Sequence, residues 1–138
     1  MDQDQQASIY TTIPGGPQLL EWFGRVPSFH DAEIIDLHLK RGDISKLRIH
    51  GWNMTTRVQN GQFVLEKHAV VQFSVSRITY LDLDDFNHQN VIDELVLSRE
   101  DTEEGTTVFQ ISLEPCYGLA SVIRAEDISV SYSPGKPE

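Results

Sequence analysis

The fold is decided within the stretch Phe29-His30-Asp31-Ala32-Glu33-Ile34-Ile35-Asp36-Leu37-His38-Leu39. From Glu33 onward its apolar and polar residues alternate with a period of two, which is typical of a strand that has one face on a core. We therefore expect Ile35, Leu37 and Leu39 on the core face. The residues before Glu33 are predicted to form a turn, in which the Asp31 carboxylate accepts backbone N–H groups.

Residues 46–54 alternate in the same way, and we expect them to return as a second strand. The apolar faces of the two strands coincide when Leu37 lies opposite Ile49, so this register is predicted. It turns the polar side chains of both strands to a second face, away from the core.

This second face brings together Asp36, His38, His50 and Trp52, with Arg48 among them. We expect Trp52 to be exposed or half-exposed, because it shares the parity of the polar residues of its strand. A tryptophan beside histidine and arginine is typical of a protein-binding surface. We therefore predict partner-binding roles for Asp36, His38, His50 and Trp52.

The rest of the chain is predicted to form short strands with little helix. Further alternating segments cover residues 63–75, 78–83, 91–97, 108–113, 119–124 and 128–132. Asn60-Gly61 is a strong hairpin signal. A helix over 18–24 is indicated by the preceding Pro17 and by Gly24 at its end.

These elements predict a mostly β (α+β) fold, either a single twisted antiparallel sheet or a rolled sandwich of about seven strands, with a short N-terminal helix. Parallel strands would require helical crossovers, for which the chain has no room. We assign residues 1–12 to a flexible N-terminus, residues 13–133 to a single β-rich domain, and residues 134–138 to a C-terminal tail.

The size and composition are those of a soluble globular protein. The chain has 138 residues, of which 39% are hydrophobic and 23% charged. No apolar run approaches the roughly 20 residues that span a bilayer. The first six residues lack the features of a secretory signal, so a cytoplasmic location is expected.

The charge of the chain is strongly acidic, with 11 basic and 21 acidic residues and a formal net charge of -10. Such a surface repels nucleic acids and anionic membranes, and it attracts a cationic partner. The alternative is that the acidic excess serves only solubility. The acidic residues predicted to contact a partner are Asp82, Asp84, Asp85, Glu100, Asp101, Glu103 and Glu104.

Histidine and carboxylate side chains are also candidate ligands of zinc, iron or manganese. The candidates are His30, Asp31, His38 and His50, but their spacing does not require a metal. Cys116 is expected to pack as a small apolar residue. Since no motif of a hydrolase or of a nucleotide-binding protein occurs, we predict no catalytic residue, no metal and no cofactor.

Three short motifs resemble those of the bacterial immunity protein 50 family. They are Phe29-His30-Asp31-Ala32-Glu33 before an alternating strand, Asn90-Val91-Ile92 after a polar break, and Cys116-Tyr117-Gly118 before the last strand. The resemblance extends from about Trp22 to Tyr132. It implies a protein that neutralises a toxin of a polymorphic, contact-dependent system. A basic nuclease is one such toxin, and an acidic inhibitor would be steered to its cleft.

We therefore predict a non-enzymatic protein that binds and neutralises a cognate bacterial toxin. One alternative is a metal-dependent enzyme that uses His30, Asp31, His38 and His50. The other is a structural subunit, in which Trp52 and an exposed strand edge pair copies of the chain into a homodimer or a larger assembly.

Overall fold

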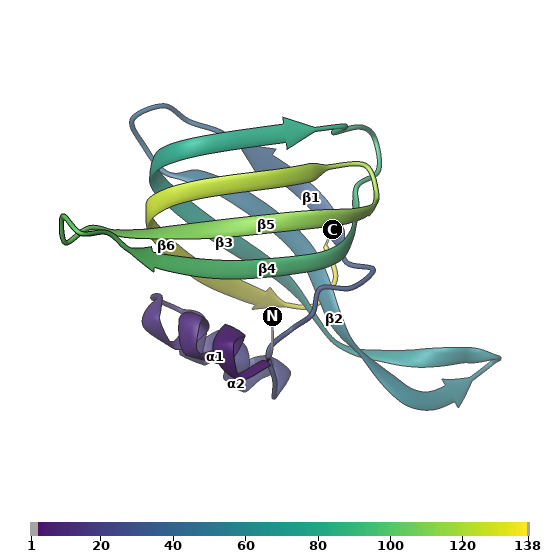
Figure 1. The fold of residues 1–138 in the computed structure, drawn as a ribbon. Helices are drawn as coiled ribbons and strands as arrows, with labels where there is room; N and C mark the ends of the chain where they lie inside the picture. The colour runs from purple at the N-terminus through teal and green to yellow at the C-terminus, as the bar shows by residue number, and fades with distance from the viewer. Residues whose placement is uncertain (1–2, 138) are drawn as a thin grey trace.

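The protein is a mostly β structure in which two short helices precede six antiparallel strands, as shown by a computed structural model that describes residues 3–137 (Figure 1). The helices are α1 (Gln3–Thr12) and α2 (Gly16–Phe23). The strands are β1 (Glu33–His38), β2 (Ser45–Gln59), β3 (Gln62–Asp84), β4 (Val91–Asp101), β5 (Thr107–Tyr117) and β6 (Ala120–Pro134). They follow one another in the order β1-β2-β3-β6-β5-β4 and close into a barrel.

The predicted fold class is thus confirmed, with a small difference in the number of strands. Two predicted strand pairs, 63–75 with 78–83 and 119–124 with 128–132, are each one long bent strand. Where β3 bends, Arg77 has a left-handed backbone with φ 53, and the register with β6 shifts just beyond it. The bend lets β3 and β6 wrap around the core instead of ending.

The register predicted for the first two strands is wrong by two residues. Leu37 pairs with Leu47 and not with Ile49, and Asp36 pairs with Arg48. The hairpin turns one residue earlier in the chain than the predicted register requires. Its end is held by Ser45, whose Oγ accepts a hydrogen bond from the Lys40 N–H at 3.0 Å.

The predicted core face of β1 is also only partly correct. The pairing of β1 with β2 shifts between Ile34 and Asp36, so Ile35 forms a bulge. A bulge adds one residue and exchanges the two faces of a strand. Ile34 therefore lies in the core, Leu37 packs against it, and Leu39 is exposed.

Residues 3–12, which the sequence analysis assigns to a flexible terminus, form the helix α1. Gln6 is buried, and its side-chain amide donates to the Leu97 carbonyl at 2.7 Å and accepts from the Leu97 N–H at 3.0 Å. Tyr10 is also buried, with its ring 6.5 Å from that of Phe73. These contacts join α1 to the barrel, although its polar sequence gives no amphipathic signal. Residues 1 and 2 lie outside the described part.

A two-stranded arm extends from the barrel where β2 and β3 run past the other strands (Figure 1). The Asn60-Gly61 turn stands at its tip, as the hairpin signal predicts. Phe63 and Leu65 share the predicted parity of the core residues of β3 but are exposed, because the arm has no layer packed on it. Neither helix of residues 3–137 has the length and apolar character needed to cross a bilayer.

Candidate functional site

The turn that precedes β1 is anchored by Phe29. This residue and Asp31 adopt left-handed backbone conformations, with φ 58 and φ 64. The Phe29 ring is buried, 6.3 Å from the ring of Phe23 and 6.2 Å from that of Phe73. Because Phe29 points into the core, its neighbours His30 and Asp31 are directed outward.

The hydrogen bonding of this turn differs from the prediction. The side chain that accepts a backbone N–H is Ser28, whose Oγ lies 3.2 Å from the His30 nitrogen. Asp31 instead donates its own backbone N–H to the Ile92 carbonyl at 2.8 Å. Its carboxylate is left free to face other side chains.

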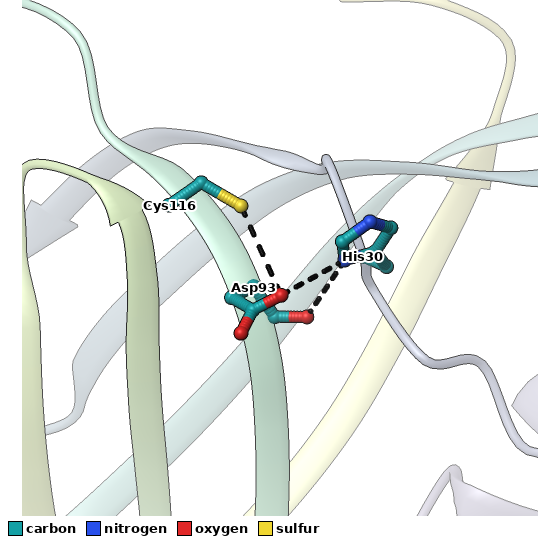
Figure 2. Close-up of side chains that lie close together, drawn as sticks. All are labelled: His30, Asp93 and Cys116. Atoms are coloured by element: carbon teal, nitrogen blue, oxygen red, sulfur yellow. Dashed lines mark hydrogen bonds and ion pairs between the residues drawn. The ribbon is translucent and has the colours of Figure 1, made fainter.

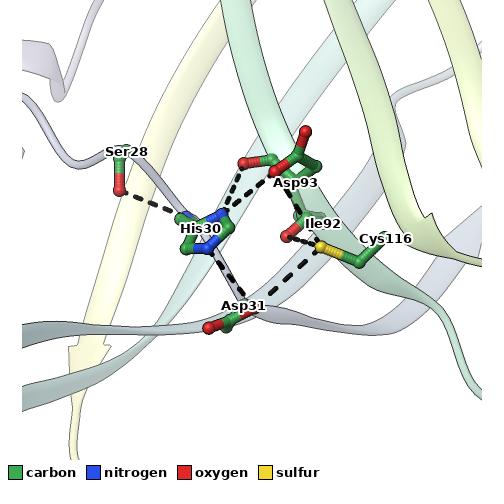
Figure 3. Close-up of polar contacts among 6 residues, drawn as sticks. All are labelled: Ser28, His30, Asp31, Ile92, Asp93 and Cys116. Carbon is green, nitrogen blue, oxygen red and sulfur yellow. Dashed lines mark hydrogen bonds and ion pairs between the residues drawn. The ribbon is translucent and has the colours of Figure 1, made fainter.

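Four side chains meet outside this turn, and we call them the seam cluster: His30, Asp31, Asp93 and Cys116 (Figures 2 and 3). His30 Nδ1 lies 3.1 Å from Asp93 Oδ1, and His30 Nε2 lies 3.6 Å from Asp31 Oδ1. Cys116 Sγ is 3.9 Å from each of the same two carboxylate oxygens. Two of the four residues come from the turn, one from β4 and one from β5.

The electrostatics of the seam cluster are set by its carboxylates. The pKa of His30 is raised, mainly because its ring bonds to the Asp93 backbone carbonyl and also because Asp31 and Asp93 are negatively charged. The pKa of the Cys116 thiol is raised by partial desolvation and then by the same two charges. A protonated thiol is a poor nucleophile. Cys116 is exposed, so the expectation that it packs as a small apolar residue is wrong.

The predicted metal ligands are only partly brought together. His30 and Asp31 belong to the seam cluster, whereas His38 lies at the far end of β1 and His50 points to a different group. Asp36 forms an ion pair with Arg48, which also donates from Nε at 3.0 Å and lowers the pKa of the Asp36 carboxyl. A cation beside Asp36 would be repelled by this arginine, which disfavours a metal ion at this position.

A second group of rings contains His50, Trp52 and His68. His50 Nε2 lies 3.1 Å from His68 Nδ1, and the Trp52 ring is 4.8 Å from the ring of His50. Trp52 is half-exposed, as predicted. His68 escaped the sequence analysis because it lies on a different strand from His50, 18 positions further along the chain, and only the pairing of β2 with β3 brings the two rings together.

This second group borders the seam cluster. A groove of about 270 Å³ separates Trp52 from His30, and Arg25 and Met54 also line it. The two groups therefore form one continuous surface, which runs from the turn before β1 to the outer face of β2 and β3.

The pKa values of His50 and His68 are both lowered, mainly because burial desolvates the two rings. The charge of Lys136 lowers both pKa values further. The pKa of His50 is also lowered by the charge of His68 and is raised in part by Glu33. The unfolded chain then takes up protons near pH 6.5 that the folded chain does not. We expect the free energy of unfolding to fall as the pH is lowered from 7 to 5, and His68→Asn to make this fall shallower. Solvent screening keeps the difference below about 1.4 kcal/mol per pH unit. Urea denaturation at both pH values measures it, and parallel pH dependences of the two proteins would contradict it.

The predicted acidic contacts are separated into two sets. The first set is Asp82, Asp84 and Asp85, at the end of β3, and the second is Glu100, Asp101, Glu103 and Glu104, at the end of β4 and in the loop after it. β4 starts just after the first set and ends in the second. Its 11 residues span about 33 Å. The two sets thus lie at opposite ends of the barrel.

The two sets also differ in their ion pairs. Glu100 pairs with Arg124 at 2.8 Å and Asp101 with Arg99 at 3.4 Å. Within residues 3–137, no such pair involves the first set of acids. The charges of the first set are therefore the less neutralised of the two.

The end of β3 also has an unpaired edge. Pairing with β2 reaches only to Val75, and from Ile78 to Asp84 the described residues of β3 pair with β6 alone. Tyr80 and Phe86 are 51% and 56% exposed in this region. Carboxylates without an ion pair and exposed aromatic rings thus occur together in residues 80–86, at the end of β3 and just after it.

The fold and these surfaces define a class of protein: an acidic, antiparallel β-barrel protein whose titratable side chains gather on its exterior. Within this class, the chain belongs to the immunity protein 50 family, whose family model matches residues 17–130. The resemblance carried by the three short motifs is thereby confirmed, and α1 lies before the matched range. No curated protein and no solved structure matches the chain.

Proposed function

We propose that this protein is a non-enzymatic immunity protein that binds a cognate toxin and neutralises it. Membership of the immunity protein 50 family is the observation that carries the proposal. The net charge of -10 supports it, because an acidic inhibitor is steered to the basic cleft of a toxin such as a nuclease.

The toxin contact is the free edge of β3 with the acids Asp82, Asp84 and Asp85. This contact is favoured over the tip after β4 because its carboxylates are less neutralised and because Tyr80 and Phe86 supply exposed aromatic area. Buried aromatic anchors inside a polar rim are typical of interfaces that bind tightly. The other acidic set lies at the far end of β4 and in the loop after it, so it contributes to the long-range field instead.

The acids on this edge also bear on the hypothesis of self-assembly. An open edge pairs readily with a copy of itself, and like charges along it oppose such pairing. A cationic partner meets no such repulsion, so the edge selects a basic protein over a second copy of this chain.

The first experiment tests the function itself. The candidate toxin is the protein encoded next to this chain, and we expect co-expression to restore the growth that this toxin alone prevents. The purified proteins should form a 1:1 complex whose association rate falls as the salt concentration rises. A toxin that stays fully active in the presence of excess immunity protein would refute the proposed function.

The second experiment tests the contact with a matched pair of variants. One carries Asp82→Lys with Asp84→Lys, and the other carries Glu103→Lys with Glu104→Lys, so both change the net charge by the same amount. Asp85 is left in place because its left-handed backbone, with φ 62, suits aspartate. Both variants should associate more slowly, but only the first should dissociate faster, by at least about tenfold. Equal dissociation rates would place the contact elsewhere and leave the function standing.

A further inference from the structure

The seam cluster lies where the barrel closes. The pairing of β1 with β4 comprises only Glu33 with Val91, which makes it the shortest strand contact of the sheet within residues 3–137. Backbone bonds from Ile92 N to Ala32 O and from Ile34 N to Asn90 O, each of 2.9 Å, complete this seam. The hydrogen bond from Asp31 N to Ile92 O, of 2.8 Å, joins the turn before β1 to β4 at the same place.

The side chains of the seam cluster stand on both sides of this seam. Figure 3 shows His30 and Asp31 on the side of the turn before β1, facing Asp93 on β4 and Cys116 on β5. Any group that bonded all of them would therefore join β1 to the opposite edge of the sheet.

The donor atoms suit a zinc ion. Zinc is bound by cysteine sulfur at about 2.3 Å and by histidine nitrogen or carboxylate oxygen at about 2.0 Å, mostly in a tetrahedron, which places the ligand atoms roughly 3.3–3.6 Å apart. One ligand atom from each of His30, Asp93 and Cys116 lies within 4.8 Å of the others. The nitrogen–oxygen distance is 3.1 Å and the sulfur–oxygen distance 3.9 Å, so small rotations of exposed side chains would close the site.

The charge of the cluster favours the same ion. In the described part of the chain, His30 is the only cationic side chain within ion-pair distance of Asp31 or Asp93. The two carboxylates thus keep their negative charge close together, and a divalent cation would neutralise it. This concentration of anionic and soft donor groups is what zinc selects.

We propose that the seam cluster binds one Zn²⁺ through His30 Nδ1, the Asp93 carboxylate and the Cys116 sulfur. On binding, His30 Nδ1 gives up its hydrogen bond to the Asp93 carbonyl and its proton, the Cys116 thiol loses its proton to solvent as the zinc–sulfur bond forms, and a water molecule completes the tetrahedron. Asp31 accepts a hydrogen bond from the Nε2–H of His30 and holds the ring in place. The ion cross-links the barrel seam and carries out no reaction. This metal site is independent of the proposed toxin contact.

The test is a titration of the full chain with Co²⁺, which takes the same ligands as zinc and is coloured. We expect one ion per chain, a near-ultraviolet charge-transfer band that reports the thiolate bond, and displacement of the cobalt by Zn²⁺. Zinc should also raise the melting temperature of the protein, because it binds only the closed seam.

Matched variants separate the site from adventitious binding. Cys116→Ser should abolish the charge-transfer band, and Asp93→Asn should weaken cobalt binding at least tenfold, because the loss of even an outer partner of a metal ligand costs about 10–100-fold in affinity. Asp31→Asn should weaken binding while the band remains, because it orients the histidine without bonding the ion. His38→Asn removes an exposed histidine at the far end of β1 and should change neither readout.

The proposal is overturned if cobalt binds without a charge-transfer band, or if Cys116→Ser and His38→Asn bind cobalt alike. It is also overturned if the parent protein binds no cobalt at all. Circular dichroism of each variant without metal shows that a loss of binding is not a loss of fold, since all four positions are exposed in the described structure.

Discussion

Phe29→Ala is expected to lower the free energy of unfolding by about 3–5 kcal/mol, the usual effect of removing a buried aromatic ring. The Phe29 side chain is 3% exposed and meets the rings of Phe23 and Phe73. Its loss leaves a cavity between the turn and the barrel, which the surrounding strands can fill only in part. Since small domains are stable by only about 5–15 kcal/mol, this one ring accounts for a large share of the stability.

Urea denaturation followed by circular dichroism measures this effect, with Phe86→Ala as the matched control. Phe86 is 56% exposed, so its removal should change the unfolding free energy by no more than about 0.5 kcal/mol. If the two variants were equally stable, Phe29 would not be the anchor of the turn. The positions of His30 and Asp31 would then need another explanation.

Tyr10→Ala is the second change with a large expected effect, a loss of about 3–5 kcal/mol. Tyr10 is 1% exposed and packs from α1 against Phe73 of β3 in the core. Its replacement would expose this end of the core and loosen α1. The helix would then still contact β4 through the pair of hydrogen bonds between Gln6 and Leu97. The prediction tests whether residues 3–12 belong to the folded domain.

The matched control is Tyr10→Phe, which removes only the hydroxyl. The Tyr10 Oη atom is buried without a hydrogen-bond partner among the described residues, and burial raises the pKa of the hydroxyl. Removing an unpaired buried polar group is neutral or stabilising, so the change should stay within about 1 kcal/mol. Thermal and urea denaturation of both variants give the comparison. A Tyr10→Ala protein as stable as the parent would restore the view of a flexible N-terminus.

Much of the fold could be predicted from local patterns. Alternation predicted the strands of the sheet, and the Asn60-Gly61 pair predicted the tip of the arm. These predictions succeeded because the direction of successive side chains and the preference for a tight turn depend on neighbouring residues. The N-terminal helix α1 could not be predicted in this way, since it is held by the long-range contacts of Gln6 and Tyr10.

The candidate site was predicted only in part, for a related reason. His30 and Asp31 were singled out because they are adjacent in the sequence. Asp93 follows His30 by 63 positions, and no pattern within a single strand places the two together. His38 and His50 were grouped by a predicted register that the observed pairing of β1 with β2, with its bulge at Ile35, does not follow.

The sequence by itself determined the family, the mostly β class and the acidic charge of this protein. These follow from composition, short motifs and alternation, which are properties of nearby residues along the chain. Only the tertiary structure decided the register of β1, the separation of the two acidic sets and the meeting of His30 with Asp93 and Cys116. Each of these depends on bulges and on the closure of the sheet, which join residues distant in sequence.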